Sequence, residues 1–127
     1  EDREAAWRAL EALYDEGRIR ALGVGSFGID LLEELFGFAR IRPVYIQSKY
    51  SVYQPGGTDQ GRESVSLMEW IGRRGITMVG VSTLRPAHGR LLLKPLEDPH
   101  VAAVARHLGR SPSQVLRRWL LQLGAAI

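Results

Sequence analysis

Apolar and polar positions along this chain follow two spacings, which predict strands and helices in turn. Nearly continuous apolar runs bounded by turn residues are typical of short buried strands, and three are present, at residues 19–25, 44–47 and 76–82. Apolar residues three and four positions apart predict amphipathic helices in the segments around them. Strands that alternate with helices indicate an α/β fold built from parallel β-α-β units.

Capping residues and apolar spacing predict the first three helices. The first covers about residues 3–16 and ends at Gly17, which can adopt the left-handed conformation of a C-cap. Asp30, with Glu33 three residues later, predicts the N-terminus of a second helix. A third helix is predicted over about residues 64–74, where the apolar residues share one face.

Two further helices are predicted near the end of the chain, each with a proline in its first turn. Asp98 and Pro99 open the fourth helix, which ends at Gly109. The fifth begins at Ser111, because Gln114 completes the reciprocal side-chain and backbone hydrogen bonds of a capping box. These signals leave little of residues 98–124 outside a helix.

Four segments, in this order, resemble motifs of the aldo-keto reductases. GRIRALGVGSF at residues 17–27 is similar to the family's G-K-I-R-A-I-G-V-S-N-F, and IRPVYIQSKYSVYQ at 41–54 to I-K-P-x-x-N-Q-V-E-Y-H-P-Y. GITMVGVSTL at 75–84 is similar to G-I-x-V-x-A-Y-S-P-L, and SPSQVLRRWLLQLG at 111–124 to T-P-A-Q-V-A-L-R-W-L-L-Q-R-G. The resemblance implies the C-terminal half of a (β/α)8 TIM barrel over residues 1–127, from the region of the fifth strand to the start of the eighth.

The length of the chain bears on this interpretation. A complete barrel of this type takes about 250 residues, whereas this chain has 127 and ends at Ala125-Ala126-Ile127, which resembles the opening of another strand. We therefore expect an internal fragment of a longer protein, whose sheet has two open edges and an exposed apolar face. A self-contained small domain is the alternative, since chains of this length can bury a sizeable core.

The resemblance also implies a nicotinamide-cofactor site at the C-terminal ends of the strands, with NADP as the cofactor. We expect this site to be weak or incomplete in the chain alone, because the family's charged phosphate contacts would lie outside it. In the family, a Ser-Asn pair and a Gln hydrogen-bond the nicotinamide carboxamide, a Tyr stacks on the ring, and a Ser and a Leu approach the pyrophosphate. Matched by position, the cofactor-binding residues of this chain are Gly25, Ser26, Gln47, Val81, Ser82 and Leu84.

Several of these positions depart from the family's pattern. Gly25 replaces Ser, Ser26 replaces Asn, and Val81 replaces the stacking Tyr, while Ile46 replaces Asn and Lys49 replaces Glu. Two functions therefore stay open. The first is an NAD(P)H-dependent reductase that converts aldehydes or ketones to alcohols by hydride transfer. The second is a reductase-like barrel that has lost its chemistry and acts as a binding or subunit-type protein.

No catalytic residue is assigned in this chain. The family protonates the carbonyl oxygen with a Tyr supported by Lys, Asp and His, and all four belong to the first half of the barrel. The four tyrosines here match other positions, and we expect the chain alone to be inactive. Because the family's site for the 2′-phosphate would also lie outside the chain, the sequence does not distinguish NADPH from NADH.

Composition narrows the remaining classes of function. With 45% hydrophobic and 24% charged residues, no cysteine and a net charge of +3, we expect a soluble cytoplasmic protein. The resemblance to the aldo-keto reductases implies a small-molecule carbonyl substrate. No apolar run approaches the roughly 20 residues that span a bilayer, and no aromatic and basic platform favours nucleic acid. The three histidines lack metal-ligand spacing, although His88 is a candidate substrate contact or an ordinary loop residue.

Overall fold

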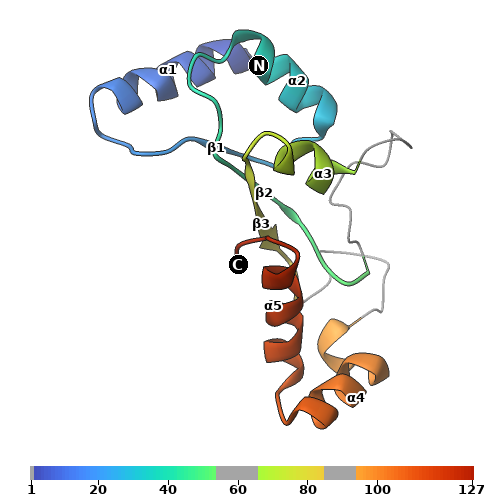
Figure 1. Cartoon of the computed structure of the whole chain (residues 1–127). Helices are drawn as coiled ribbons and strands as arrows, with labels where there is room; N and C mark the ends of the chain where they lie inside the picture. Colours follow the sequence, from blue (N-terminus) through green and yellow to red (C-terminus); the bar gives the residue numbers. More distant parts are fainter. Residues whose placement is uncertain (1, 54–65, 85–93) are drawn as a thin grey trace.

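The computed structural model describes residues 2–53, 66–84 and 94–127. Its helices are α1 (Arg3–Asp15), α2 (Ile29–Phe38), α3 (Leu67–Gly72), the short 3-10 helix η1 (Pro95–Glu97), α4 (Pro99–Leu108) and α5 (Pro112–Gln122). Figure 1 shows α1 and α2 at one end of a central sheet and α4 and α5 at the other. None of these helices is long and apolar enough to cross a membrane.

The sheet consists of parallel strands in chain order: β1 (Gly23–Gly25), β2 (Tyr45–Lys49) and β3 (Thr77–Val81). Beyond β3, Ala126 forms a parallel bridge with Val79. The Ala126 N–H donates to the Met78 carbonyl at 2.7 Å, and its carbonyl accepts from the Gly80 N–H at 2.9 Å. These two bonds place Ala126 where the predicted next strand would pair with β3. Neighbours in the sheet follow one another in sequence, as they do in a (β/α) barrel.

Strand boundaries differ from the predicted ones because a strand extends only where a partner lies beside it. The first predicted strand, residues 19–25, shortens to β1, since β2 begins at Tyr45, directly opposite Gly23. The second, residues 44–47, extends instead to Lys49, which pairs with Val81 of β3. The third predicted strand loses one residue at each end.

The helices cover one face of the sheet. Val24, Ile46 and Met78 lie side by side in register and are buried. They join a single core with helix residues that include Leu32, Leu35, Trp70, Ile71 and Leu120. The other face exposes Tyr45, Gln47, Lys49 and Thr77. The expectation that this face would be apolar holds only in part: the half-buried Val79 and Val81 lie on it beside Gln47 and Lys49, whereas the alternation along β2 turns Ile46 toward the helices.

Most of the predicted helix ends are confirmed. Gly17 and Gly109 have φ angles of +70° and +59°, and Asp98 and Ser111 cap α4 and α5 through their side chains. The predicted cap at Asp30 is wrong: the N-cap of α2 is Gly28, and the helix begins at Ile29. Ile29 is 2% exposed, so its burial in the core places the start of the helix before Asp30, whose carboxylate lies in the first turn.

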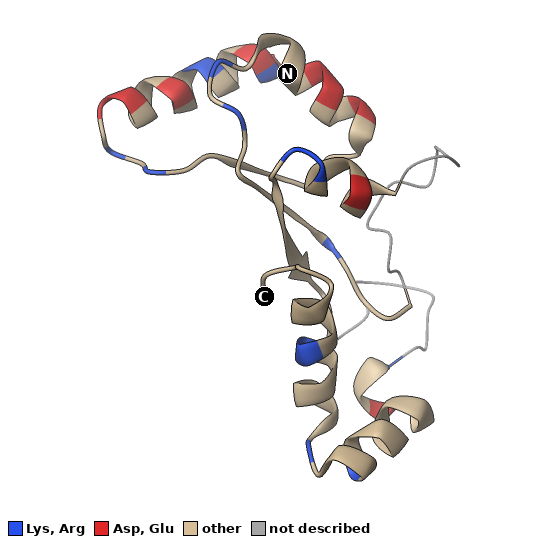
Figure 2. Cartoon of the chain, viewed as in Figure 1, with Lys and Arg blue, Asp and Glu red and all other residues tan. Residues whose placement is uncertain are grey.

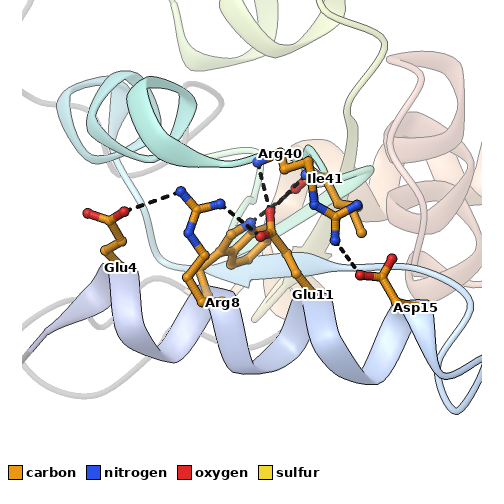
Figure 3. Close-up of polar contacts among 7 residues, drawn as sticks. Glu4, Arg8, Glu11, Asp15, Arg40 and Ile41 are labelled. Atoms are coloured by element: carbon orange, nitrogen blue, oxygen red, sulfur yellow. Dashed lines mark hydrogen bonds and ion pairs between the residues drawn. The ribbon is translucent and has the colours of Figure 1, made fainter.

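Helix α1 is attached to the segment that leads into β2 by hydrogen bonds to the backbone of Arg40 and Ile41. The Glu11 carboxylate accepts from the Arg40 N–H at 2.7 Å and from the Ile41 N–H at 2.8 Å. Trp7 Nε1 donates to the Ile41 carbonyl at 3.0 Å. Figure 3 shows Glu11 extending from α1 to this segment, with Arg8 beside it. The hydrogen bond from Ile41 is the main cause that lowers the pKa of the Glu11 carboxyl group, although its side chain is buried.

Candidate functional site

The structure brings the ends of β1 and β2 together at the carboxyl edge of the sheet. Gly25 pairs with Gln47 in register. The N–H of Ser26, the residue after β1, donates to the Gln47 carbonyl at 2.8 Å. These three residues, assigned to the cofactor site from the sequence, are therefore neighbours in space. In parallel α/β folds this edge is where ligands bind.

Gly25 and Gln47 leave space for a ligand on the exposed face of the sheet. A Cβ atom built at Gly25 would meet no atom within 4 Å. Gln47 is exposed, and its side-chain amide makes no hydrogen bond within the described part of the chain. An amide carries both donors and an acceptor, so it can pair with a carboxamide such as that of nicotinamide. The residues present at this position fit that group.

Ser26 and Ser82 share an unusual backbone conformation. Both have a φ angle of +58°, and no other non-glycine residue among those described has a positive φ. Each follows directly after a strand, Ser26 after β1 and Ser82 after β3, and each is exposed. Left-handed backbone at residues other than glycine costs energy, and it clusters at binding and active sites. The sequence predicted both serines as site residues but gave no sign of this conformation.

The remaining predicted site residues lie at the end of β3. Val81 is half-buried, and its carbonyl accepts from the Tyr50 N–H at 3.1 Å, which joins the ends of β2 and β3. Leu84 is also half-buried and is the last described residue before the gap at 85–93. His88, the candidate substrate contact, lies outside the described residues.

Two residues at this edge were not assigned to the site from the sequence. Lys49 is the last residue of β2, on the same exposed face as Gln47. The prediction ended this strand at Gln47, although continued alternation would have placed Lys49 on the ligand face. Thr83 is 5% exposed, and its hydroxyl has no hydrogen-bond partner among the described residues. A buried hydroxyl without a partner cannot be predicted from sequence, because it depends on the packing around it.

A hydrogen bond links the segment after β2 to the start of α4. The Tyr53 hydroxyl donates to the Asp98 carboxylate, which also accepts from the His100 N–H at 2.8 Å. The bond to Asp98 raises the pKa of Tyr53 to about 12. The same bond, followed by that from His100, lowers the pKa of Asp98. Within the described residues, no group of three or more His, Asp or Glu side chains could hold a metal ion.

We expect the contribution of this hydrogen bond to stability to depend on pH at both extremes. Because the pKa of Tyr53 rises from about 10 in the unfolded chain to about 12, the contribution is full below pH ~10 and is lost as the pH rises through 12. Because the pKa of Asp98 is lowered, the contribution is also lost as the pH falls below about 3.9, the unfolded value. Urea unfolding of the wild type and Tyr53→Phe should differ by a constant amount between these limits. An equal difference at pH 7 and pH 12.5 would contradict this prediction.

Parallel strands in chain order with helices between them are typical of an α/β barrel, and the residues assigned to the cofactor site lie at the carboxyl edge of this sheet. A sequence model described as the Aldo/keto reductase family matches residues 1–127. The chain belongs to the aldo-keto reductase family.

Individual relatives agree with this assignment. The chain is 33% identical to an NAD(P)H-dependent D-xylose reductase of Pyricularia oryzae, over 98% of this chain and 38% of the relative. It is 38% identical to an uncharacterised oxidoreductase of Bacillus subtilis, over 94% of this chain and 38% of the relative. A crystal structure of an aldo/keto reductase from Brucella melitensis matches with a TM-score of 0.74 and 27% identity, over 96% of this chain and 41% of that one. The fold is therefore part of a (β/α)8 barrel, and the chain spans about two fifths of these relatives.

Proposed function

We propose that residues 1–127 form the cofactor-holding part of an NAD(P)H-dependent aldo-keto reductase that reduces aldehydes or ketones to alcohols. The observation that carries this proposal is the carboxyl edge of the sheet. There the Gln47 amide, which has no hydrogen bond among the described residues, lies beside the open space at Gly25, and a strained serine follows each neighbouring strand. The named activity of the Pyricularia oryzae relative, an NAD(P)H-dependent reductase, supports it.

Each site residue has a role in this proposal. The Gln47 amide and the Ser26 hydroxyl bind the nicotinamide carboxamide, and Val81 provides an apolar contact for the ring. Ser82, together with the backbone near Leu84, approaches the pyrophosphate. The cofactor, when bound, supplies the hydride. This chain contributes the position of the nicotinamide ring, because neutral hydrogen bonds fix which face of the ring is turned toward the substrate.

The second candidate is a reductase-like barrel without chemistry, which serves as a binding or subunit-type protein. The replacements at the nicotinamide positions favour it. Gly25 offers no side chain for the carboxamide, and Val81 gives an apolar contact with less area than an aromatic ring. Both candidates place a ligand at the carboxyl edge, so the affinity for the cofactor distinguishes them.

The test is NADPH binding by the Gln47→Ala variant, measured by the fluorescence of the nicotinamide in this chain and in any longer protein that contains it. We expect about a fivefold weaker affinity, because a neutral hydrogen bond contributes about 1 kcal/mol. Gln122→Ala, which removes the same side chain from the exposed end of α5, should bind as the wild type does. If the Gln47 and Gln122 variants bind NADPH with equal affinity, the non-catalytic alternative is favoured.

A further inference from the structure

Lys49 is the sole charged residue of the three strands. The sequences of β1, β2 and β3 are GVG, YIQSK and TMVGV. Figure 2 shows the strands without acidic residues and with a basic residue at the end of β2. A lysine in this place puts one positive charge at the carboxyl edge, where the candidate site lies.

The strand geometry turns Lys49 toward the ligand face. Along β2 exposed and buried residues alternate, and Lys49 is exposed on the same side as Gln47, two residues before it. Its partner in register is Val81, the residue before the strained Ser82. Lys49 therefore lies between the position that reaches the nicotinamide and the position that reaches the pyrophosphate in the proposed function.

The ammonium group of Lys49 makes no ion pair and no hydrogen bond within the part of the chain that the structure describes. Some cations of the described residues are paired, as Arg3 is with Glu34 at 2.8 Å and Lys94 with Glu97 at 2.9 Å. A lysine that supports the fold through a carboxylate would show such a bond. The charge of Lys49 is available to a ligand.

We propose that Lys49 binds an anionic oxygen group, a phosphate or a carboxylate, of the molecule held at the carboxyl edge. The proposal rests on the proposed function for the place of that molecule, and it adds the charge that the molecule must carry. Ammonium groups bind phosphate and carboxylate oxygens through short, charge-assisted hydrogen bonds. Two sources fit this chemistry: a phosphate of the cofactor, or a carboxylate on the carbonyl substrate.

The experiment measures the binding of four probes to this chain by calorimetry and NMR titration. The reduced nicotinamide riboside lacks the phosphates and the adenosine of NADPH, and benzaldehyde lacks the carboxylate of 4-carboxybenzaldehyde. The variants are Lys49→Gln, which removes the charge, and Lys49→Arg, which keeps it. Lys94→Gln is the matched control, because it removes the same charge from the residue before η1, where the ammonium is bound to Glu97.

We expect Lys49→Gln to weaken the binding of at least one anionic probe about tenfold, which corresponds to about 1.4 kcal/mol, while Lys49→Arg and Lys94→Gln bind as the wild type does. The neutral riboside and benzaldehyde should be unaffected, and the effect should shrink as salt is added. A loss confined to NADPH identifies the cofactor phosphate, and a loss confined to 4-carboxybenzaldehyde identifies a substrate carboxylate.

Two results would overturn the proposal. One is equal binding of both anionic probes by the Lys49→Gln and Lys94→Gln variants. The other is the absence of any binding of these probes by the wild-type chain at millimolar concentration. A separate measurement tests the proposed function: if Gln47→Ala binds the riboside as tightly as the wild type does, the proposed function fails. In that case a loss with Lys49→Gln would still show an anion site at this edge.

Discussion

Replacing Glu11 with alanine is expected to lower the melting temperature of this chain by on the order of 5–10 °C. The Glu11 carboxylate is the acceptor for two backbone N–H groups, those of Arg40 and Ile41. Both donors lie where the chain turns from α2 into β2, and the Glu11 side chain is 3% exposed. Alanine removes a buried acceptor and leaves these two partly buried donors without it, which is more costly than the loss of an exposed hydrogen bond.

Two variants separate this cause from a loss of charge or of helix propensity. Glu4 lies on the same helix and also pairs with Arg8, but its side chain is 54% exposed. Glu4→Ala removes this exposed carboxylate. It should change the melting temperature little, as exposed ion pairs do. Glu11→Gln keeps an oxygen that can accept from the backbone and should fall between the wild type and Glu11→Ala. Equal melting temperatures for Glu4→Ala and Glu11→Ala would contradict the role assigned to the Ile41 hydrogen bond.

Acid should reveal the same interaction. Because the hydrogen bond from Ile41 lowers the pKa of Glu11 in the folded chain, its contribution is present above the unfolded value of about 4.3 and is lost as the pH falls below it. The difference in melting temperature between the wild type and Glu11→Gln should therefore narrow below pH ~4. A difference that stays constant down to pH 2 would show that the charge of Glu11 has no part in it.

The elements of this fold could be predicted from the sequence because their signals are local. Caps such as Asp98 and Ser111 form their hydrogen bonds within one turn, so the spacing of residues along the chain suffices. The ends of the strands depend on a neighbour instead. Lys49 belongs to β2 only because Val81 lies beside it. The predicted start of α2 was wrong for a similar reason, because the burial of Ile29 outweighed the capping preference of Asp30.

For the candidate site, the sequence predicted which residues take part but not their backbone conformation. Gln47 and Ser82 could be assigned from motifs, and the structure places both at one edge of the sheet. The positive φ of Ser26 and Ser82 could not, because it results from how each strand leaves the sheet. Glu11 lay outside any prediction as well: its sequence context is that of an exposed helical residue, and its acceptor role exists only once α1 packs on the segment at Ile41.

We expect this chain alone not to catalyse the reduction of a model aldehyde, so that the rate of NADPH oxidation equals the rate in buffer. Reduction of a carbonyl needs a proton donor at hydrogen-bond distance from the substrate oxygen, and such a donor contributes about 10²–10⁴-fold. Tyr50 is buried and stacks on Trp119, with ring centroids 5.7 Å apart. The Tyr53 hydroxyl donates to Asp98.

The two other tyrosines lie away from the carboxyl edge. Tyr14 is on α1, and Tyr45 is the first residue of β2, where its ring lies against Gly23. The measurement is NADPH absorbance with the purified chain, beside Gln47→Ala. Turnover by the wild type that Gln47→Ala lowers would show that the chain contains its own proton donor. Turnover that both proteins show equally, with NADPH well below its dissociation constant, would come from a reductase that does not use the Gln47 amide.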